Sequence, residues 1–418
     1  MNKIIKHSLV FLRIAIGLVM LFSGFVKGVD PLGTTYKFND YFGVVGLTGM
    51  YEVSFWMAGL MNLAEFMIGL ALIFNVFTNF TMWLALLLMS FFTILTFLLA
   101  YYNPITDCGC FGDALKVTNW QTFFKNLIFI SIIILLFINR KRLKSNRTII
   151  TQWSITSIGV VAFITLTIYC YTHLPIIDFR PYKIGTYLPS QMTIPEGAPS
   201  DVYEQYFVLE DTSNETTLKI ESNQYIQDST YWYSGTKWKF VSTTEPKLIK
   251  KGYEPPIHGF SISDKNGNDI TNDILSDTAI SFLLITYNID KANDEGLKKA
   301  NQLYLQSQTI GSNRFYAITA SSEGEINKKK KALGLAFDFY TCDEIVLKTI
   351  VRSNPGLVML KEGVVLDMWH YNDFPVNEKK LPNLASALDN QRKTNEWLLT
   401  ILFFITVSTI VFIVFRKK

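Results

Sequence analysis

Two cysteines separated by one residue, Cys108 and Cys110, are the groups whose type and spacing most directly suggest chemistry in this 418-residue sequence. A disulfide requires Cα atoms about 4.4–6.8 Å apart, and an extended pair at positions i and i+2 lies near or beyond the upper limit. Gly109 between them permits the tight turn that would bring the thiols together. A bridge in such a turn would be strained, and strained disulfides exchange more readily.

Three interpretations of the Cys108–Cys110 pair are compatible with its sequence. It is an exchangeable redox pair, in which case the protein is a thiol-disulfide oxidoreductase; it is a static staple of its loop; or it supplies two ligands to a metal ion. The loop around the pair, 103–113, contains no histidine, and His173 would have to approach from a distant segment. We expect the redox pair and no metal site.

Two ionisable residues, Glu65 and Arg13, lie within long apolar segments. A charge at the centre of a bilayer costs roughly 2.5–3.5 kcal/mol even on insertion scales, so such a residue is usually paired or functional. We expect Glu65 to form a proton or quinone site, with Arg13 as its partner. A structural buried pair and snorkelling of Arg13 toward the inner surface are the alternatives. The sequence establishes no cofactor, and a quinone is the one candidate.

These residues are carried by segments long and apolar enough to cross a membrane as helices, which takes about 20 residues. Six segments meet that length: roughly 8–27, 53–75, 79–101, 121–139, 152–172 and 397–415. The first is preceded by Lys3 and Lys6, as in a signal peptide, but it has no small-residue cleavage site and is expected to remain as an anchor. The lipid bilayer is therefore the expected surroundings of much of the chain.

The short loops differ in charge between the two sides of the predicted bundle. The segments before the first span, between the fourth and fifth spans and after the last span contain basic residues and no acid. By the positive-inside rule both termini lie in the cytoplasm, and residues 28–52, 102–120 and 173–396 lie outside. All four cysteines then lie in or beside an oxidising compartment.

The large outer segment is not basic. Residues 173–395 contain 24 Lys or Arg and 28 Asp or Glu, a net charge of −4, whereas the whole chain has a net charge of +4. A nucleic-acid-binding surface needs clustered positive charge, so no nucleic-acid partner is expected.

The membrane part resembles a known group of proteins. The stretch 12–27, with Asp30-Pro-Leu-Gly and Glu65-Phe-Met-Ile-Gly, resembles the DoxX family of four-helix membrane proteins. The loop Cys108-Gly-Cys-Phe-Gly-Asp113 resembles that of the related MauE proteins, which are associated with disulfide maturation of a periplasmic enzyme beside a thioredoxin-like partner. The resemblance implies a bundle in a bacterial inner membrane, thiol-redox chemistry and a periplasmic protein or thiol partner. DoxX-like proteins are also linked to quinone-coupled sulfur oxidation.

From about residue 254 the sequence alternates between strand and helix patterns. Strands are expected at 280–287, 314–320, 357–361 and 364–369, and helices at 294–308, 323–334 and 342–352. Such alternation ending in an antiparallel hairpin predicts an α/β domain with a mixed sheet. The order of elements resembles a thioredoxin fold.

In that resemblance Asn354-Pro355 takes the place of the cis-proline, and Asn354, Pro355 and Gly356 are expected to bind an extended peptide of a partner. The catalytic Cys-x-x-Cys of thioredoxins would follow the first strand, where residues 288–295 include no cysteine. The domain is therefore expected to bind and not to catalyse. Cys342 is expected to be a small buried residue, the alternative being a thiol activated by a helix dipole.

We expect a mixed fold in five parts: a DoxX/MauE-like four-helix bundle (1–150), a fifth span (151–173), a linker and β-rich insertion with a hairpin near Gly235 (174–252), a periplasmic thioredoxin-like domain (253–395) and a C-terminal span (396–418). The leading hypothesis is a membrane thiol-redox component in which Cys108 and Cys110 exchange electrons with a periplasmic partner, a quinone being a second candidate. The competing hypothesis is a non-enzymatic scaffold or assembly factor whose outer domain binds a partner. The sequence indicates neither the oligomeric state nor the direction of electron flow.

Overall fold

The computed structural model describes residues 3–105, 108–115, 117–250, 252–310 and 314–376, together with positions 405 and 409. The chain forms two compact units, residues 1–186 with 260–418, and residues 187–259. The expected C-terminal span, 397–415, lies outside the described residues apart from those two positions.

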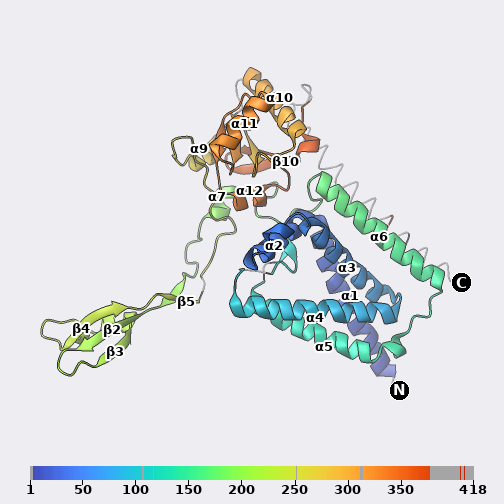
Figure 1. Ribbon diagram of the computed structural model, residues 1–418, viewed down its shortest axis with the longest axis horizontal. Helices are drawn as coiled ribbons and strands as arrows, with labels where there is room; N and C mark the ends of the chain where they lie inside the picture. Colours follow the sequence, from blue (N-terminus) through green and yellow to red (C-terminus); the bar gives the residue numbers. More distant parts are fainter. Residues whose placement is uncertain are drawn as a thin grey trace. The chain divides into compact units, whose positions relative to one another are not determined.

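The first unit begins with the membrane helices (Figure 1). In the described part of the chain, five helices are long and apolar enough to cross a bilayer: α1 (Lys3–Val29), α3 (Ser54–Phe74), α4 (Thr78–Tyr102), α5 (Asn119–Ile138) and α6 (Ile149–Thr172). They match the first five predicted spans closely. The protein is therefore a multi-pass membrane protein.

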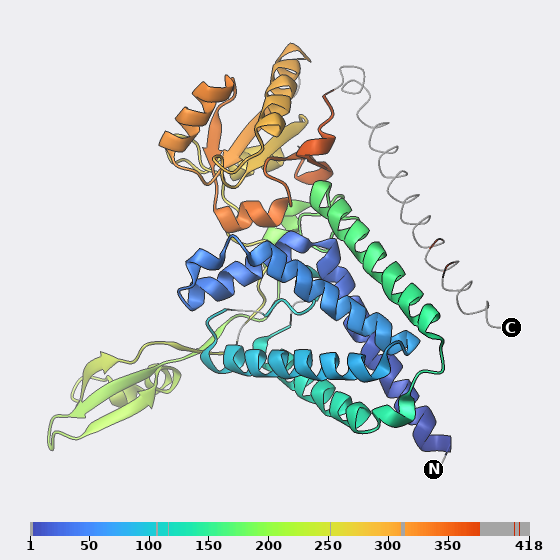
Figure 2. The same ribbon diagram turned by 45° about the vertical axis from the view of Figure 1, so that its right-hand side comes forward.

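Helices α1 and α3 pack closely because glycines lie where they meet. A Cβ atom on Gly69 would lie 2.3 Å from the backbone nitrogen of Leu21, and one on Gly24 would lie 2.5 Å from that of Phe66. Small residues let membrane helices approach to backbone contact. Helices α4 and α5 run side by side as a second pair (Figures 1 and 2). The close α1–α3 contact brings polar side chains of both helices together inside the bundle.

The segment between α1 and α3 contains a helix that the sequence analysis did not predict. Helix α2 (Pro31–Val44) begins with Asp30 as its N-cap, whose side chain accepts a hydrogen bond from the backbone nitrogen of Gly33, and with Pro31 in its first turn. These are ordinary signals for the start of a helix. The described residues of the loop between α4 and α5 include a 3-10 turn, Gly112–Ala114.

The C-terminal domain is built on a five-stranded sheet in the order β10-β9-β6-β7-β8. Its strands are β6 (Ser281–Thr286), β7 (Arg314–Thr319), β8 (Phe339–Thr341), β9 (Gly356–Lys361) and β10 (Val364–His370). Strands β6, β7 and β8 are parallel, whereas β9 is antiparallel to both β6 and β10. A parallel β-α-β unit followed by an antiparallel hairpin on its other side is the thioredoxin arrangement, as predicted.

Helices α9 (Thr271–Ser276), α10 (Asp294–Ile310), α11 (Glu323–Leu333) and α12 (Glu344–Ile350) surround this sheet. Every residue of β6 is buried; Phe282 and Leu284 share a core with Leu297 and Leu303 of α10. Helix α12 is shorter than the predicted 342–352 because the Asp343 side chain caps it, accepting from the nitrogens of Ile345 and Val346.

The second unit contains a short helix, α7 (Leu188–Met192), and small antiparallel sheets. Strand β2 (Tyr206–Asp211) pairs with β3 (Thr217–Glu221) and β4 (Trp238–Thr243), β1 (Val202–Glu204) pairs with β5 (Lys247–Lys250), and α8 (Ser222–Gln227) follows β3. The predicted hairpin near Gly235 is wrong. Residues 229–231 form a 3-10 turn capped by Asp228, and the chain resumes as β4 beside β2.

Candidate functional site

The loop between α4 and α5 brings the two predicted redox cysteines together. Gly109 adopts the left-handed conformation, with φ at +63°, and the Sγ atoms of Cys108 and Cys110 lie 2.8 Å apart as free thiols. A disulfide bond measures about 2.05 Å, so closing it requires only a small movement of the loop. The tight turn expected from the intervening glycine is therefore present.

Both cysteine carbonyls are held by side chains of other helices. The hydroxyl of Tyr41, on α2, donates to the carbonyl oxygen of Cys108 at 2.7 Å. The hydroxyl oxygen of Ser23, on α1, lies 2.7 Å from the carbonyl oxygen of Cys110. Within the loop, the nitrogen of Gly112 donates to the carbonyl oxygen of Gly109 at 3.0 Å. The position of the pair is thus determined from two sides.

The two thiols differ in acidity. A hydrogen bond from Cys110, with smaller contributions from Thr122 and Lys125, lowers the pKa of Cys108 to about 6 against the opposing effect of burial. The same hydrogen bond, together with burial, raises the pKa of Cys110 well above its ordinary value. Because the thiolate is the attacking form of cysteine, Cys108 is suited to be the nucleophile and Cys110 the thiol that keeps its proton.

Glu65 lies directly beneath this loop, in a buried polar cluster on α1 and α3. Its Oε2 atom accepts from the Lys27 ammonium group at 2.7 Å, and its Oε1 atom lies 2.8 Å from the Ser23 hydroxyl. Asn62 Nδ2 donates to the carbonyl oxygen of Lys27 at 3.4 Å. Ser23 therefore touches both Glu65 and the Cys110 carbonyl, and links the buried carboxylate to the cysteine loop.

The prediction that Arg13 pairs with Glu65 is wrong, because Lys27 takes that place. Arg13 precedes Lys27 on the same helix by 14 residues, which is about 21 Å at 1.5 Å per residue. Arg13 is buried toward the other end of α1, and its Nε atom has no hydrogen-bond partner among the described residues. The missed signal was the i, i+4 spacing of Ser23 and Lys27, which places both on one helical face.

The environment of Glu65 does not support the predicted quinone site. Each carboxylate oxygen already has a partner, Lys27 on one side and Ser23 on the other. A carboxylate cannot donate a hydrogen bond to a quinone carbonyl, and the lysine that could donate is held by that carboxylate. We therefore propose no electron transfer to a quinone at this position.

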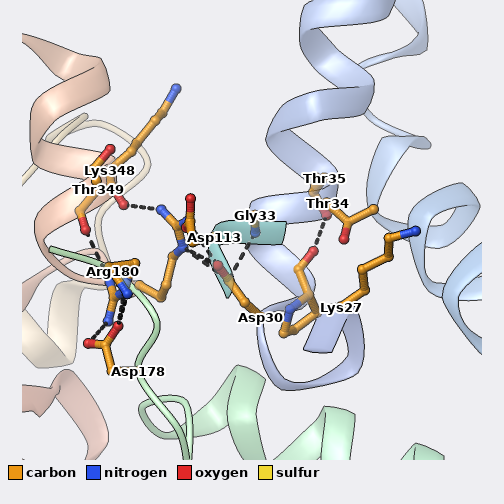
Figure 3. A network of polar contacts seen from close by, with 12 residues as sticks. Lys27, Asp30, Gly33, Thr34, Thr35, Asp113, Asp178, Arg180, Lys348 and Thr349 are labelled. Atoms are coloured by element: carbon orange, nitrogen blue, oxygen red, sulfur yellow. Dashed lines mark hydrogen bonds and ion pairs between the residues drawn. The ribbon is translucent and has the colours of Figure 1, made fainter. Parts of the chain in front are cut away.

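Arg352, which the sequence analysis missed, connects the thioredoxin-like domain to Asp30 and Asp113 at this end of the bundle. Figure 3 labels both aspartates. The Nε atom of Arg352 donates to both carboxylate oxygens of Asp30, at 3.0 and 2.9 Å, and its Nη2 atom donates to Asp113 at 3.0 Å. Burial alone would raise the pKa of Asp30, but the Arg352 guanidinium outweighs it and holds that pKa below its ordinary value. Asp113 follows Cys110 in the cysteine loop, and Asp30 begins α2, which also carries Tyr41.

The residues predicted to bind a partner peptide, Asn354, Pro355 and Gly356, lie where β9 begins, and the Asn354–Pro355 peptide bond is cis as expected. Pro355 and Gly356 are buried. The carbonyl oxygen of Asn354 accepts from the nitrogen of Asn293 at 3.0 Å, and its Nδ2 atom donates to the carbonyl oxygen of Asn288 at 2.8 Å. The chain's own 288–293 segment thus takes up the carbonyl oxygen and the side-chain amide of Asn354, and peptide binding at this position stays a prediction.

The remaining candidate ligands and thiols lie elsewhere. Cys342 is buried, and burial raises its pKa to about 11, which fits the small buried residue that was predicted. Helix α12 begins after it, capped by Asp343. His173 Nδ1 lies 3.8 Å from Asp373 and not at the cysteine loop. Among the described residues, no three His, Cys, Asp or Glu side chains are arranged to hold a metal ion.

The acidity of Cys108 predicts a pH profile. In the reduced full-length protein, the rate of alkylation of Cys108 should rise with pH around a midpoint of about 6, because the thiol is protonated below it and the thiolate forms above it. Replacement of Cys110 by alanine removes the hydrogen bond and should move the midpoint toward the ordinary value of about 8.5. The measurement is alkylation rate against pH, with the modified peptide identified by mass spectrometry. A wild-type midpoint near 8.5 would contradict the assignment.

The Lys27–Glu65 pair predicts a non-additive effect on stability. Lys27→Met and Glu65→Leu each leave one charge buried without its partner, which typically costs about 3–5 kcal/mol, whereas the double variant removes both charges. Each single variant should therefore lower the thermal unfolding midpoint of the detergent-solubilised protein more than the double variant does. Losses that simply add in the double variant would show that the two charges are not coupled.

Comparison with known proteins agrees with this description. Residues 5–139 match the model of the family described as methylamine utilisation protein MauE, and no curated protein matches the chain. Among solved structures, a candidate protein disulfide isomerase from Bacteroides thetaiotaomicron matches at 13% identity, over 32% of this chain and 86% of that chain, with a TM-score of 0.25. The thioredoxin-like assignment depends on the strand order given above. The chain is thus a membrane protein whose first third is MauE-like and whose C-terminal domain is thioredoxin-like.

Proposed function

We propose that the protein is a membrane thiol-disulfide exchange component, with Cys108 and Cys110 as its redox pair and a protein thiol or disulfide as its partner. The observation that carries this proposal is the Cys108–Gly109–Cys110 turn, which places two free thiols 2.8 Å apart. The unequal acidity of the two thiols supports it, because exchange needs one thiolate and one proton-bearing thiol at physiological pH.

The exchange proceeds in two displacements. The Cys108 thiolate attacks one sulfur of a partner disulfide, forms a mixed disulfide and releases one partner thiolate. The Cys110 thiol then loses its proton and attacks the Cys108 sulfur, which forms the Cys108–Cys110 disulfide and releases the second partner sulfur. Two electrons pass to the partner, which takes up two protons as its disulfide becomes a dithiol. The reverse sequence oxidises a partner dithiol, and the reduction potential of the partner decides the direction.

The thioredoxin-like domain has a supporting role in this proposal. The residues between β6 and α10 include no cysteine, and Cys342 is buried with a raised pKa. A domain without a reactive thiol cannot carry out the exchange itself. Its contact with Asp30 and Asp113 instead places it beside the cysteine pair.

The proposal predicts that Cys110→Ala and Cys108→Ala differ in how much mixed disulfide they form with the partner. Cys110→Ala removes the second nucleophile, so the mixed disulfide between Cys108 and the partner should accumulate. Cys108→Ala should give fewer adducts, because burial still raises the pKa of Cys110 after its hydrogen bond with Cys108 is lost. The measurement is a non-reducing gel of tagged full-length protein from acid-quenched, alkylated cells, followed by mass spectrometry of the peptide joined through Cys108.

Two outcomes would contradict exchange at this pair. Equal adducts in both variants would indicate adventitious oxidation of the two thiols. Absence of adducts in both variants, with a wild-type pair that remains oxidised under mild reductant, would favour the competing scaffold function with a static staple.

We further propose that the protein lies in a bacterial inner membrane with the cysteine loop and the thioredoxin-like domain in the periplasm. The basic residues Arg140, Lys141, Arg142 and Arg147 lie at the opposite end of α5 and α6 from the cysteine loop, which supports this orientation. After mild reduction, Cys108 in intact spheroplasts should react with a membrane-impermeant maleimide. Labelling that requires lysis would reverse the orientation.

A further inference from the structure

The cysteine loop has a third attachment, and it comes from the other domain. Asp113 lies three residues after Cys110, and its carboxylate accepts from Arg352 Nη2 at 3.0 Å. We propose that Arg352 is a positioning residue for the Cys108–Cys110 pair, which holds Asp113 and thereby fixes the loop in the geometry that favours disulfide closure. This inference depends on the proposed function only in taking the pair to be exchangeable.

The position of Asp113 affects the position of the two thiols because backbone hydrogen bonds hold the loop between them in one conformation. The nitrogen of Gly112 donates to the carbonyl oxygen of Gly109, and the nitrogen of Ala114 donates to that of Phe111 at 3.2 Å. The Phe111 side chain is buried, with the Lys125 ammonium group 4.3 Å from its ring centroid. A hydrogen-bonded turn therefore connects Asp113 to the backbone that carries Cys110.

Arg352 is itself held in one orientation. Its side chain is 7% exposed, its Nε atom is paired with Asp30, and its Nη1 atom donates to the carbonyl oxygen of Lys348. Its guanidinium carbon lies 5.4 Å from the ring centroid of Tyr36 on α2. A planar guanidinium that is fixed on three sides presents its remaining donor in one direction, toward Asp113.

The backbone just before Arg352 is also held by hydrogen bonds, which come from Arg180. Arg180 pairs with Asp178 at 2.7 Å, and its Nη1 atom donates to the carbonyl oxygens of Thr349 and Ile350, just before Arg352 (Figure 3). The backbone that carries Arg352 is therefore anchored as well. Preorganisation of this kind lowers the entropy lost when the two thiols join.

The effect of Arg352 can be measured as a change in the equilibrium constant for forming the Cys108–Cys110 disulfide. The reduced pair reacts with oxidised glutathione to give the Cys108–Cys110 disulfide and two molecules of reduced glutathione. If the loop loses its third attachment, its two thiols meet less often and the equilibrium constant for closure falls. Loss of one charged hydrogen bond should lower it roughly tenfold, which corresponds to about 1.4 kcal/mol.

The test is to equilibrate the full-length protein, in detergent, with a series of glutathione ratios and to measure the fraction of oxidised Cys108–Cys110 peptide. Asp113→Asn removes the loop's charge but leaves Arg352 paired with Asp30. We expect it and Arg352→Met each to lower the closure constant roughly tenfold. Arg352→Lys keeps the charge but cannot span both carboxylates, and should restore the constant only in part.

Lys348→Met is the matched control. Lys348 lies on α12, just before Arg352, and its ammonium group is 2.7 Å from Glu344 and 5.1 Å from the Tyr36 ring centroid. Among the described residues, its ammonium group makes no ion pair with the loop. We expect its closure constant to equal that of the wild type. An unchanged constant in Asp113→Asn, or an equal fall in Lys348→Met, would overturn the positioning role. A wild-type pair that does not exchange with glutathione at all would overturn the proposed function as well, whereas a missing partner adduct would not affect this result.

Discussion

Two opposite charges buried 2.7 Å apart, on Lys27 and Glu65, constrain how the first and third helices of this protein pack. Neither charge is tolerable in an apolar interior without the other, so α1 and α3 must meet at one height and in one rotation. Gly24 and Gly69 make that approach possible. Ser23, one turn from Lys27, then lies between Glu65 and the Cys110 carbonyl. The position of the redox loop thus follows from the requirement to neutralise a buried charge.

A second charged cluster, Asp30 and Asp113 with Arg352, lies at the end of the bundle that carries the cysteine loop. Asp30 is both the N-cap of α2 and the main partner of Arg352, so one carboxylate begins a helix and joins two domains. Helix α2 in turn supplies Tyr41 to the Cys108 carbonyl. The cysteine pair therefore depends on α1, α2 and the thioredoxin-like domain together, although its own segment is only a short loop.

Local patterns predicted the elements well. Hydropathy gave five spans that the structure confirms, and strand and helix periodicity placed β6, β7, β9 and β10 within one residue of their observed ends. Gly109 correctly indicated the turn between the cysteines. These features depend on neighbouring residues only, so they can be predicted from a single sequence.

The failures concern pairings between distant residues. Hydropathy locates a helix along the chain but not its rotation, so Arg13 and Lys27 could not be distinguished as partners of Glu65 without the spacing of Ser23 and Lys27. Arg352 and Asp30 are 322 residues apart, and no local pattern connects them. The contact between Asn354 and Asn288 was missed for a similar reason, because the two residues are remote in sequence.

That separation of Arg352 from its partners has a consequence for biogenesis. Asp30 and Asp113 leave the ribosome 322 and 239 residues before Arg352, which at roughly 5–20 residues per second is an interval on the order of 10 to 60 seconds. During that time a nascent bundle would carry two aspartates at the membrane surface without the cation that neutralises them. The thiol loop of a truncated or stalled chain would consequently differ in charge and freedom from that of the finished protein, a difference that quality-control proteases could recognise.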